Sequence, residues 1–163
     1  EYFNQHPEVK LVIAPHVIDE NHLVEIIRKL KRPYVRYTRA DEKNVRKADC
    51  LIIDCFGLLS SIYRYGEIAY IGGGFGVGIH NTLEAAVYGI PVIFGPKYQK
   101  FQEAIQLLEA KGAFSVKDYE ELKTLLDRML TDEVFLRESG MNASNYVTGN
   151  AGATDKIMSM INF

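Results

Sequence analysis

Several features that would place this sequence in a specialised class are missing from it. Its 163 residues include only two cysteines, and it has neither a basic and then apolar leader nor an apolar run near the length of a membrane span, which is about 20 residues. The net charge of −2 gives no general attraction to nucleic acid, so we expect no nucleic-acid partner. Missing too is an initial methionine, which suggests a domain of a longer chain. These absences leave a soluble globular domain.

The two cysteines favour no metal centre. Cys50 and Cys55 flank a short apolar segment, and neither a second cysteine pair nor a histidine cluster accompanies them. We expect both to pack as small apolar residues at the ends of a strand, in a reducing, cytoplasmic setting. We therefore expect no bound metal and no cofactor.

Strand and helix patterns alternate along the chain. Short, continuously apolar runs predict strands at residues 9–14, 34–38, 51–54, 68–71, 92–94 and 113–116. Helical patterns are predicted at residues 19–30, 56–65, 81–88, 101–111, 119–130, 132–147 and 152–162. Gly112 is expected to cap the helix 101–111, and Asp118 the helix 119–130. This order is typical of the α/β class, a doubly wound parallel sheet, which we assign to one domain over residues 1–163.

The chain is organised around residues 68–96, where a glycine-rich loop joins a strand to a helix. The loop matches neither G-x-G-x-x-G nor the P-loop pattern in any frame, so the two best-known nucleotide fingerprints are absent. A flexible backbone that opens onto a helix N-terminus still suits a phosphate or a carboxylate. A close-packed turn is the alternative, but the number of glycines favours approach of a ligand. The glycines are Gly72, Gly73, Gly74, Gly76 and Gly78.

Polar residues at the end of this loop allow two interpretations. Asn81 and Glu84 have the spacing of a near capping box, which alone would explain both residues. Alternatively, Glu84 accepts hydrogen bonds from sugar hydroxyls at the mouth of a site, and the spacing does not decide between the two. His80 either binds phosphate or only bonds to the backbone, and the residue alone favours the backbone.

Other candidates follow neighbouring strands, whose carboxyl ends should share one edge of the sheet. Pro15 and His16 follow the first strand, and Gly57 follows the third. Lys97 follows the fifth strand, where it either meets a phosphate or is a solvated surface lysine. Residues 29–47 hold eight basic side chains, which we interpret mainly as a solvated face, and a basic patch beside an anionic lipid surface stays open as the alternative.

The central stretch resembles the 3-deoxy-D-manno-octulosonic acid (Kdo) transferases of lipopolysaccharide biosynthesis. The family patterns G-H-N-x-L-E and G-x-P-V-x-x-G-P look like residues 78–84 and 89–96. Two further motifs, APRHPER and GDTxGEL, look like residues 14–20 and 54–59, and the likeness covers residues 10–150 in order.

This chain departs from the family pattern at three positions. His16 replaces the family's arginine, Leu58 replaces a glutamate, and Ile79 stands where glycine is usual in a loop that is one residue shorter. These changes affect the expected donor-phosphate contacts of the first and third loops and leave the corner of His80, Asn81 and Glu84 intact.

The resemblance implies a Rossmann-like domain, the C-terminal half of a two-domain GT-B glycosyltransferase. It implies binding of the donor CMP-Kdo and an inverting, metal-independent transfer to the lipid A precursor at the cytoplasmic face of the bacterial inner membrane. The acceptor site, the membrane anchor and the general base belong to an N-terminal domain missing from this chain, so no catalytic residue is expected here and the isolated domain should be inactive. The helix at 152–162 would pack toward that domain. The implied donor-binding residues are Pro15, His16, Gly57, Gly74, Gly76, Gly78, His80, Asn81, Glu84 and Lys97.

Two alternatives stay open from the sequence. The first is another GT-B glycosyltransferase or a UDP-sugar epimerase domain that uses a uridine nucleotide sugar. The second is a flavodoxin-like binding module with no nucleotide site, which leaves the glycine-rich loop unexplained.

Overall fold

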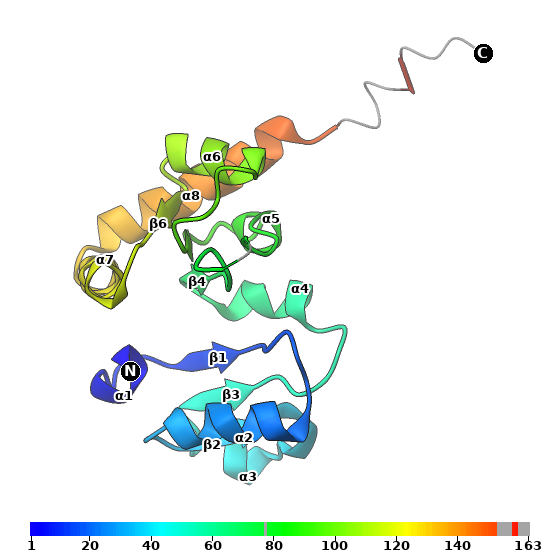
Figure 1. Ribbon diagram of the computed structural model, residues 1–163, viewed down its shortest axis with the longest axis vertical. Coiled ribbons are helices and arrows are strands. Elements are labelled where there is room, and N and C mark those ends of the chain that lie inside the picture. Colours follow the sequence, from blue (N-terminus) through cyan, green and yellow to red (C-terminus); the bar gives the residue numbers. More distant parts are fainter. Residues whose placement is uncertain (77, 153–157, 160–163) are drawn as a thin grey trace. The chain divides into compact units, whose positions relative to one another are not determined.

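The computed structural model describes residues 1–76, 78–152 and 158–159. The chain divides into two compact units, Glu1–Ser61 and Ile62–Phe163, and each is described by itself. All six predicted strands are present, and they pair in parallel as two three-stranded sheets, one in each unit. The predicted α/β class with parallel sheets is confirmed (Figure 1). The assignment of residues 1–163 to a single domain stays a prediction.

In the first unit, the middle strand of the sheet is the last of its three strands in sequence. The order is β1 (Leu11–Ile13), β3 (Cys50–Ile52) and β2 (Tyr34–Arg36). The strands are joined by short helices and turns, and α4 lies at the boundary with the second unit. These elements are α1 (Tyr2–Gln5), α2 (Glu20–Lys29), the 3₁₀ turn η1 (Tyr37–Arg39), α3 (Glu42–Val45) and α4 (Leu59–Ile62).

The core of the first unit lies between α2 and this sheet (Figure 1). Leu23 of α2 packs with Cys50 and Ile52 of the middle strand, and all three are buried. Asp19 is the N-cap of α2, and its carboxylate accepts a hydrogen bond from the backbone N–H of His22 at 3.0 Å. The apolar face of α2 thus covers one side of the sheet.

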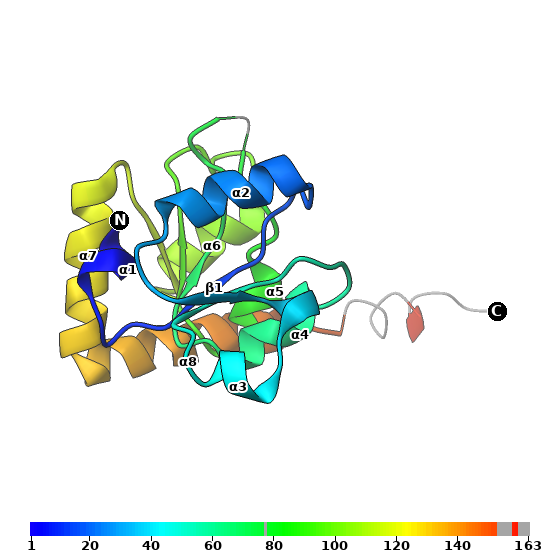
Figure 2. The same cartoon turned by 90° about the horizontal axis from the view of Figure 1, so that it is seen from below.

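In the second unit, the strands pair in sequence order. The sheet runs β4 (Ala69–Tyr70), β5 (Val92–Phe94) and β6 (Ala113–Ser115), so each crossover joins direct neighbours. Helices α7 and α8 contact each other and meet at a steep angle (Figure 2). The helical elements of this unit are η2 (Tyr63–Tyr65), α5 (Leu83–Ala86), α6 (Gln102–Glu109), α7 (Tyr119–Thr131) and α8 (Glu133–Asn150).

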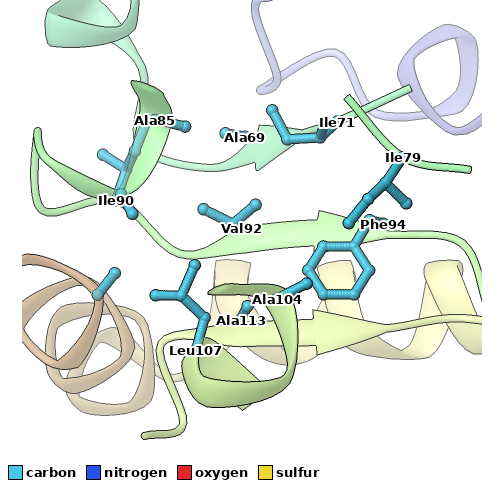
Figure 3. Close-up of a cluster of buried hydrophobic side chains, with 12 residues drawn as sticks. Ala69, Ile71, Ile79, Ala85, Ile90, Val92, Phe94, Ala104, Leu107 and Ala113 are labelled. Atoms are coloured by element: carbon cyan, nitrogen blue, oxygen red, sulfur yellow. The ribbon is translucent and has the colours of Figure 1, made fainter. Parts of the chain in front are cut away.

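The core of the second unit is centred on β5. Figure 3 shows Val92 on the middle strand, with Ala69 on one side and Ala113 on the other. Every residue of β5 is fully buried, which explains why this strand reads as an uninterrupted apolar run. Leu107 of α6 packs against this cluster and covers the side of the sheet that faces the helix.

Two predicted helix caps have different outcomes. Asp118 caps α7 as predicted, since its carboxylate accepts from the backbone N–H of Glu121 at 2.9 Å. Gly112 does bond back to the end of α6, but the left-handed residue there is Lys111, with φ of 59°. A Cβ at Gly112 would lie 2.6 Å from the backbone of Ala143, so this position needs glycine because α8 packs against it.

The sequence patterns missed two short helices. Both α1 and α3 have only four residues, too few for a helical repeat to be recognisable. The helix predicted over 152–162 lies outside the described residues, apart from 152, 158 and 159. Within the described part of the chain, no helix combines the length and the apolar character needed to cross a bilayer.

Candidate functional site

The glycine-rich loop of the second unit folds back on itself at the carboxyl end of β4. Gly73 and Ile79 form an antiparallel bridge, and the backbone N–H of His80 donates to Gly72 at 3.2 Å. The N–H of Gly74 donates across the loop to the carbonyl of Gly78 at 2.6 Å. The loop is therefore a closed turn, and two of its backbone amides are used inside it. Fewer amides are left for a ligand than the sequence interpretation assumes.

Internal packing explains part of the glycine content of this loop. Gly73 and Gly74 have φ of 93° and 80°, in the left-handed region that favours glycine. A Cβ at Gly73 would lie 2.1 Å from the carbonyl oxygen of Gly78. A Cβ at Gly74 would lie 2.7 Å from Cα of Gly95, in the turn that follows β5. These glycines allow two loops to approach closely, which is the close-packed turn that the sequence left as the alternative.

Gly76 and Gly78 differ in their surroundings. A Cβ at Gly78 would lie 2.9 Å from the ring of Phe101, so Gly78 too is explained by packing. At Gly76, by contrast, nothing lies within 4 Å of an added Cβ. Among the loop glycines predicted to bind the donor, Gly76 is thus the one whose side faces open space and lies open to a ligand.

Lys97 lies beside the glycine-rich loop, as the shared sheet edge predicts. Its backbone N–H donates to the carbonyl of Gly74 at 2.8 Å, and its side chain is exposed. The connections after β4 and β5 therefore meet at one edge. This contact places an exposed lysine beside the loop, and its positive charge suits an anionic ligand.

The corner of Asn81 and Glu84 combines both interpretations of the sequence. The side-chain oxygen of Asn81 accepts from the backbone N–H of Leu83 at 3.0 Å, but the N-cap of α5 is Thr82, so the helix begins one residue later than predicted. Its amide nitrogen donates to Oε1 of Glu84 at 3.0 Å, so the glutamate bonds to a side chain and not to the backbone of a capping box. Glu84 is half-buried, and within the described part of the chain its Oε2 has no hydrogen bond. That oxygen is available to accept from a ligand.

Two further residues complete this corner. His80 is exposed at the end of the loop, where the sequence places it. Tyr63 of η2 was not predicted. Its pKa is raised mainly by burial and also by the negative charge of Glu84, which therefore lies nearby. No local sequence pattern links these two residues, because they are brought together only by the packing of η2 and α5 on the same core.

The remaining predicted residues belong to the first unit. Pro15 is half-buried and His16 is exposed, in the connection that follows β1. Gly57 follows β3, has φ of 87°, and has no atom within 4 Å of an added Cβ. All three lie at the carboxyl end of their sheet, as predicted.

A polar cluster that the sequence reasoning did not identify lies at the same end of this sheet. Asp54 is buried and accepts hydrogen bonds from Nε of Arg36 at 2.8 Å, and from the backbone N–H and Oγ1 of Thr38 at 2.8 and 2.6 Å. Burial would raise the pKa of Asp54, but the bonds from Thr38 and Arg36 outweigh it and hold the pKa at about 2. The available signal in the sequence was a carboxylate two residues after a buried strand.

Neither cysteine forms a disulfide. Cys50 is buried, and burial raises the pKa of its thiol to about 12, while Cys55 is half-buried. The packing predicted for Cys50 is confirmed. In the parts of the chain that the structure describes, no three His, Cys, Asp or Glu side chains converge as metal ligands would.

Comparison with known proteins identifies the relatives of this chain, although no family model matches it. It is 37% identical over 125 residues to the 3-deoxy-D-manno-octulosonic acid transferase of Aquifex aeolicus, a match that covers 76% of this chain and 34% of the relative. The enzyme of the same name from Rickettsia bellii is 32% identical over 116 residues, covering 69% of this chain and 28% of the relative. The chain belongs to the Kdo transferase family. It spans about a third of the length of these relatives.

A solved structure has the same fold. The C-terminal CMP-Kdo binding domain of WaaA from Acinetobacter baumannii matches with a TM-score of 0.75, covering 90% of this chain and 77% of that chain. The sequences are 18% identical in this match, so it carries the fold alone. The α/β architecture predicted from the alternating strands and helices is thus also the architecture of that solved domain.

Proposed function

We propose that this chain is the donor-binding domain of a Kdo transferase and that it binds CMP-Kdo. The observation that carries the proposal is the corner of His80, Asn81 and Glu84 beside a closed glycine-rich loop, in a chain of this family. The family relationship and the fold of the Acinetobacter baumannii domain support it. As in other GT-B glycosyltransferases, a second domain would hold the acceptor.

The chemistry of the second unit suits the donor. CMP-Kdo carries a phosphodiester, a sugar carboxylate and several hydroxyl groups. The exposed ammonium of Lys97 beside the loop would attract the anionic groups, and the open side of Gly76 would let the phosphate approach the backbone. Oε2 of Glu84, with no hydrogen bond in the described part of the chain, would accept from a hydroxyl of the donor. His80 would add a donor at the same corner.

The reaction we propose for the whole protein is an inverting displacement without a metal. A hydroxyl oxygen of the acceptor attacks the anomeric carbon of Kdo, the new glycosidic bond forms as the bond to the CMP phosphate breaks, and the hydroxyl proton passes to a general base. That base would lie in another domain. This chain would hold the departing CMP, whose negative charge increases as it leaves.

The proposal extends to the setting of the complete protein. The acceptor would be the lipid A precursor, and transfer would take place at the cytoplasmic face of the bacterial inner membrane during lipopolysaccharide biosynthesis. Membership of the Kdo transferase family supports this extension. In the first unit, Pro15, His16 and Gly57 are proposed as contributors to nucleotide binding.

Calorimetric titration of the 163-residue chain with CMP tests the proposal. We expect saturable heat with CMP and much weaker binding of UMP. Glu84→Gln keeps the acceptor for Asn81 but removes the charge, so CMP should bind more weakly with little change in the melting temperature. Glu109→Gln, on an exposed position of α6, is the matched control and should bind as the unchanged protein does. Absence of heat with millimolar CMP on folded protein would contradict the proposal.

A further inference from the structure

One buried carboxylate connects the ends of two strands in the first unit. Asp54 lies two residues beyond β3, and its side chain is 1% exposed. It accepts three hydrogen bonds from the segment that ends β2: one from Arg36, the last residue of that strand, and two from Thr38 in η1. The chain segments that leave β2 and β3 are therefore held together at the carboxyl end of the sheet.

Arg36 extends this connection to the third strand of the sheet. Its Nη1 donates to both carboxylate oxygens of Glu20, at 2.8 and 2.9 Å. Glu20 is the first residue of α2, directly after the connection 14–19 that leaves β1. Asp54 is thus linked to all three connections at this edge of the sheet, either by its own hydrogen bonds or through the guanidinium of Arg36.

The loop that follows Asp54 has little packing of its own. Phe56 is 82% exposed, and Gly57 has no atom within 4 Å of an added Cβ. Because the tip of the loop is exposed, its shape depends on the half-buried residues at its two ends, Cys55 and Leu58, and on the anchor before them. The anchored end is Asp54, which three short hydrogen bonds fix.

We propose that Asp54 is a positioning residue for ligand binding by the first unit. It touches no ligand, but it orders the connections 14–19 and 55–58, which carry Pro15, His16 and Gly57. This inference rests on the proposed function, because it assumes that these connections contact a cytidine nucleotide. In some proteins a buried ionic group serves to hold a specific geometry.

The chain offers a matched control at the other end of the same strand. Asp49 directly precedes β3 and is paired with Lys10 and Arg32. Asp49→Asn breaks ion pairs in the same unit, but at the amino end of the sheet, away from the candidate connections. A general loss of stability should affect Asp49→Asn and Asp54→Asn alike, whereas positioning should depend on Asp54 alone.

The experiment compares the affinity for CMP per folded molecule across four variants of the 163-residue chain. We expect Asp54→Asn and Thr38→Val to bind about tenfold more weakly, because the first removes the buried charge and the second removes one hydrogen bond to it. Thr38→Ser keeps the hydroxyl that donates to Asp54 and should restore the affinity, and Asp49→Asn should not change it. Equal affinity of Thr38→Val and the unchanged protein, or equal weakening by Asp49→Asn, would overturn the inference.

A second measurement separates this inference from the proposed function. If the unchanged protein binds no CMP, the proposed function fails, but positioning can still be measured without a ligand. Backbone amide resonances at residues 14, 16–19 and 55–58 should shift or broaden in Thr38→Val and not in Thr38→Ser. Unchanged resonances in both variants would show that Asp54 does not order these connections.

Discussion

Arg32 holds the N-terminal segment to the rest of the first unit, so its removal should destabilise that unit strongly. Nη1 donates to the carbonyl oxygens of Phe3, His6 and Val9 at 2.8, 2.7 and 2.9 Å, and Nη2 donates to Pro7 at 2.9 Å. The guanidinium also lies 4.1 Å from the centre of the Phe3 ring and 3.3 Å from the carboxylate of Asp49. The side chain is 11% exposed.

The magnitude follows from these contacts. A hydrogen bond to a charged group contributes about 1.5–3 kcal/mol, so four give an upper limit of about 6–12 kcal/mol. The carbonyl groups recover bonds to water when the side chain is truncated, so we expect Arg32→Ala to lower the free energy of unfolding by about 3–5 kcal/mol. For a chain of this size that loss lowers the melting temperature by about 6–20 °C.

Thermal and urea unfolding, followed by circular dichroism, measure this effect. Arg32→Lys keeps the charge but not the planar set of donors, so it should recover only part of the loss. Lys31→Ala changes the neighbouring exposed side chain and is the control, with an expected change below about 0.5 kcal/mol. A loss below about 1 kcal/mol for Arg32→Ala would refute the reasoning that these carbonyl contacts stabilise the unit.

Three further predictions concern individual residues. The pKa of Asp54 is depressed to about 2 from an ordinary 3.8, so its ionised form should add about 2 kcal/mol to the free energy of unfolding above pH 4, and this stabilisation should be lost as the pH falls toward 2. Acid unfolding of Asp54→Asn should lack this pH-dependent loss, and an acid profile equal to that of the unchanged protein would contradict the assignment. Gly74→Ala should lower the free energy of unfolding by about 1–3 kcal/mol through its left-handed backbone and its contact with Gly95, whereas Gly76→Ala should be nearly neutral; equal urea midpoints for the two would disprove this difference. Gly112→Ala should cost a similar 1–3 kcal/mol in urea unfolding because α8 lies against it, and a stabilised variant would show that only the helix cap matters there.

Much of the fold could be predicted because its signals are local. Strand β5 and its neighbours are short, continuously apolar runs. Asp19 and Asp118 are N-cap residues, and each is followed by a helical repeat. The helices α1 and α3 could not be predicted, since one turn of helix gives no apolar repeat. Gly112 has the position of a helix cap in the sequence, and only the packing of α8 reveals its second role.

The candidate site was predictable where it depends on neighbouring residues. The side-chain pairing of Asn81 with Glu84 spans three residues, so the spacing identified the pair even though the bond differs from a capping box. The partners of Asp54 lie 16 and 18 residues earlier in the chain, and only the strand pairing brings them together. Sequence alone could not separate the loop glycines that packing requires from Gly76, which is open. The distinction depends on contacts with residues that follow β5 in the chain.

Amide resonance mapping of CMP binding tests the central claim most directly. The account predicts that CMP, added to the isotope-labelled 163-residue chain, shifts the amide resonances of Gly76, His80 and Glu84 with one saturable dissociation constant. UMP at the same concentration should shift them much less. A folded chain whose resonances at these residues stay unchanged at millimolar CMP would contradict the claim that this domain binds the nucleotide of the donor.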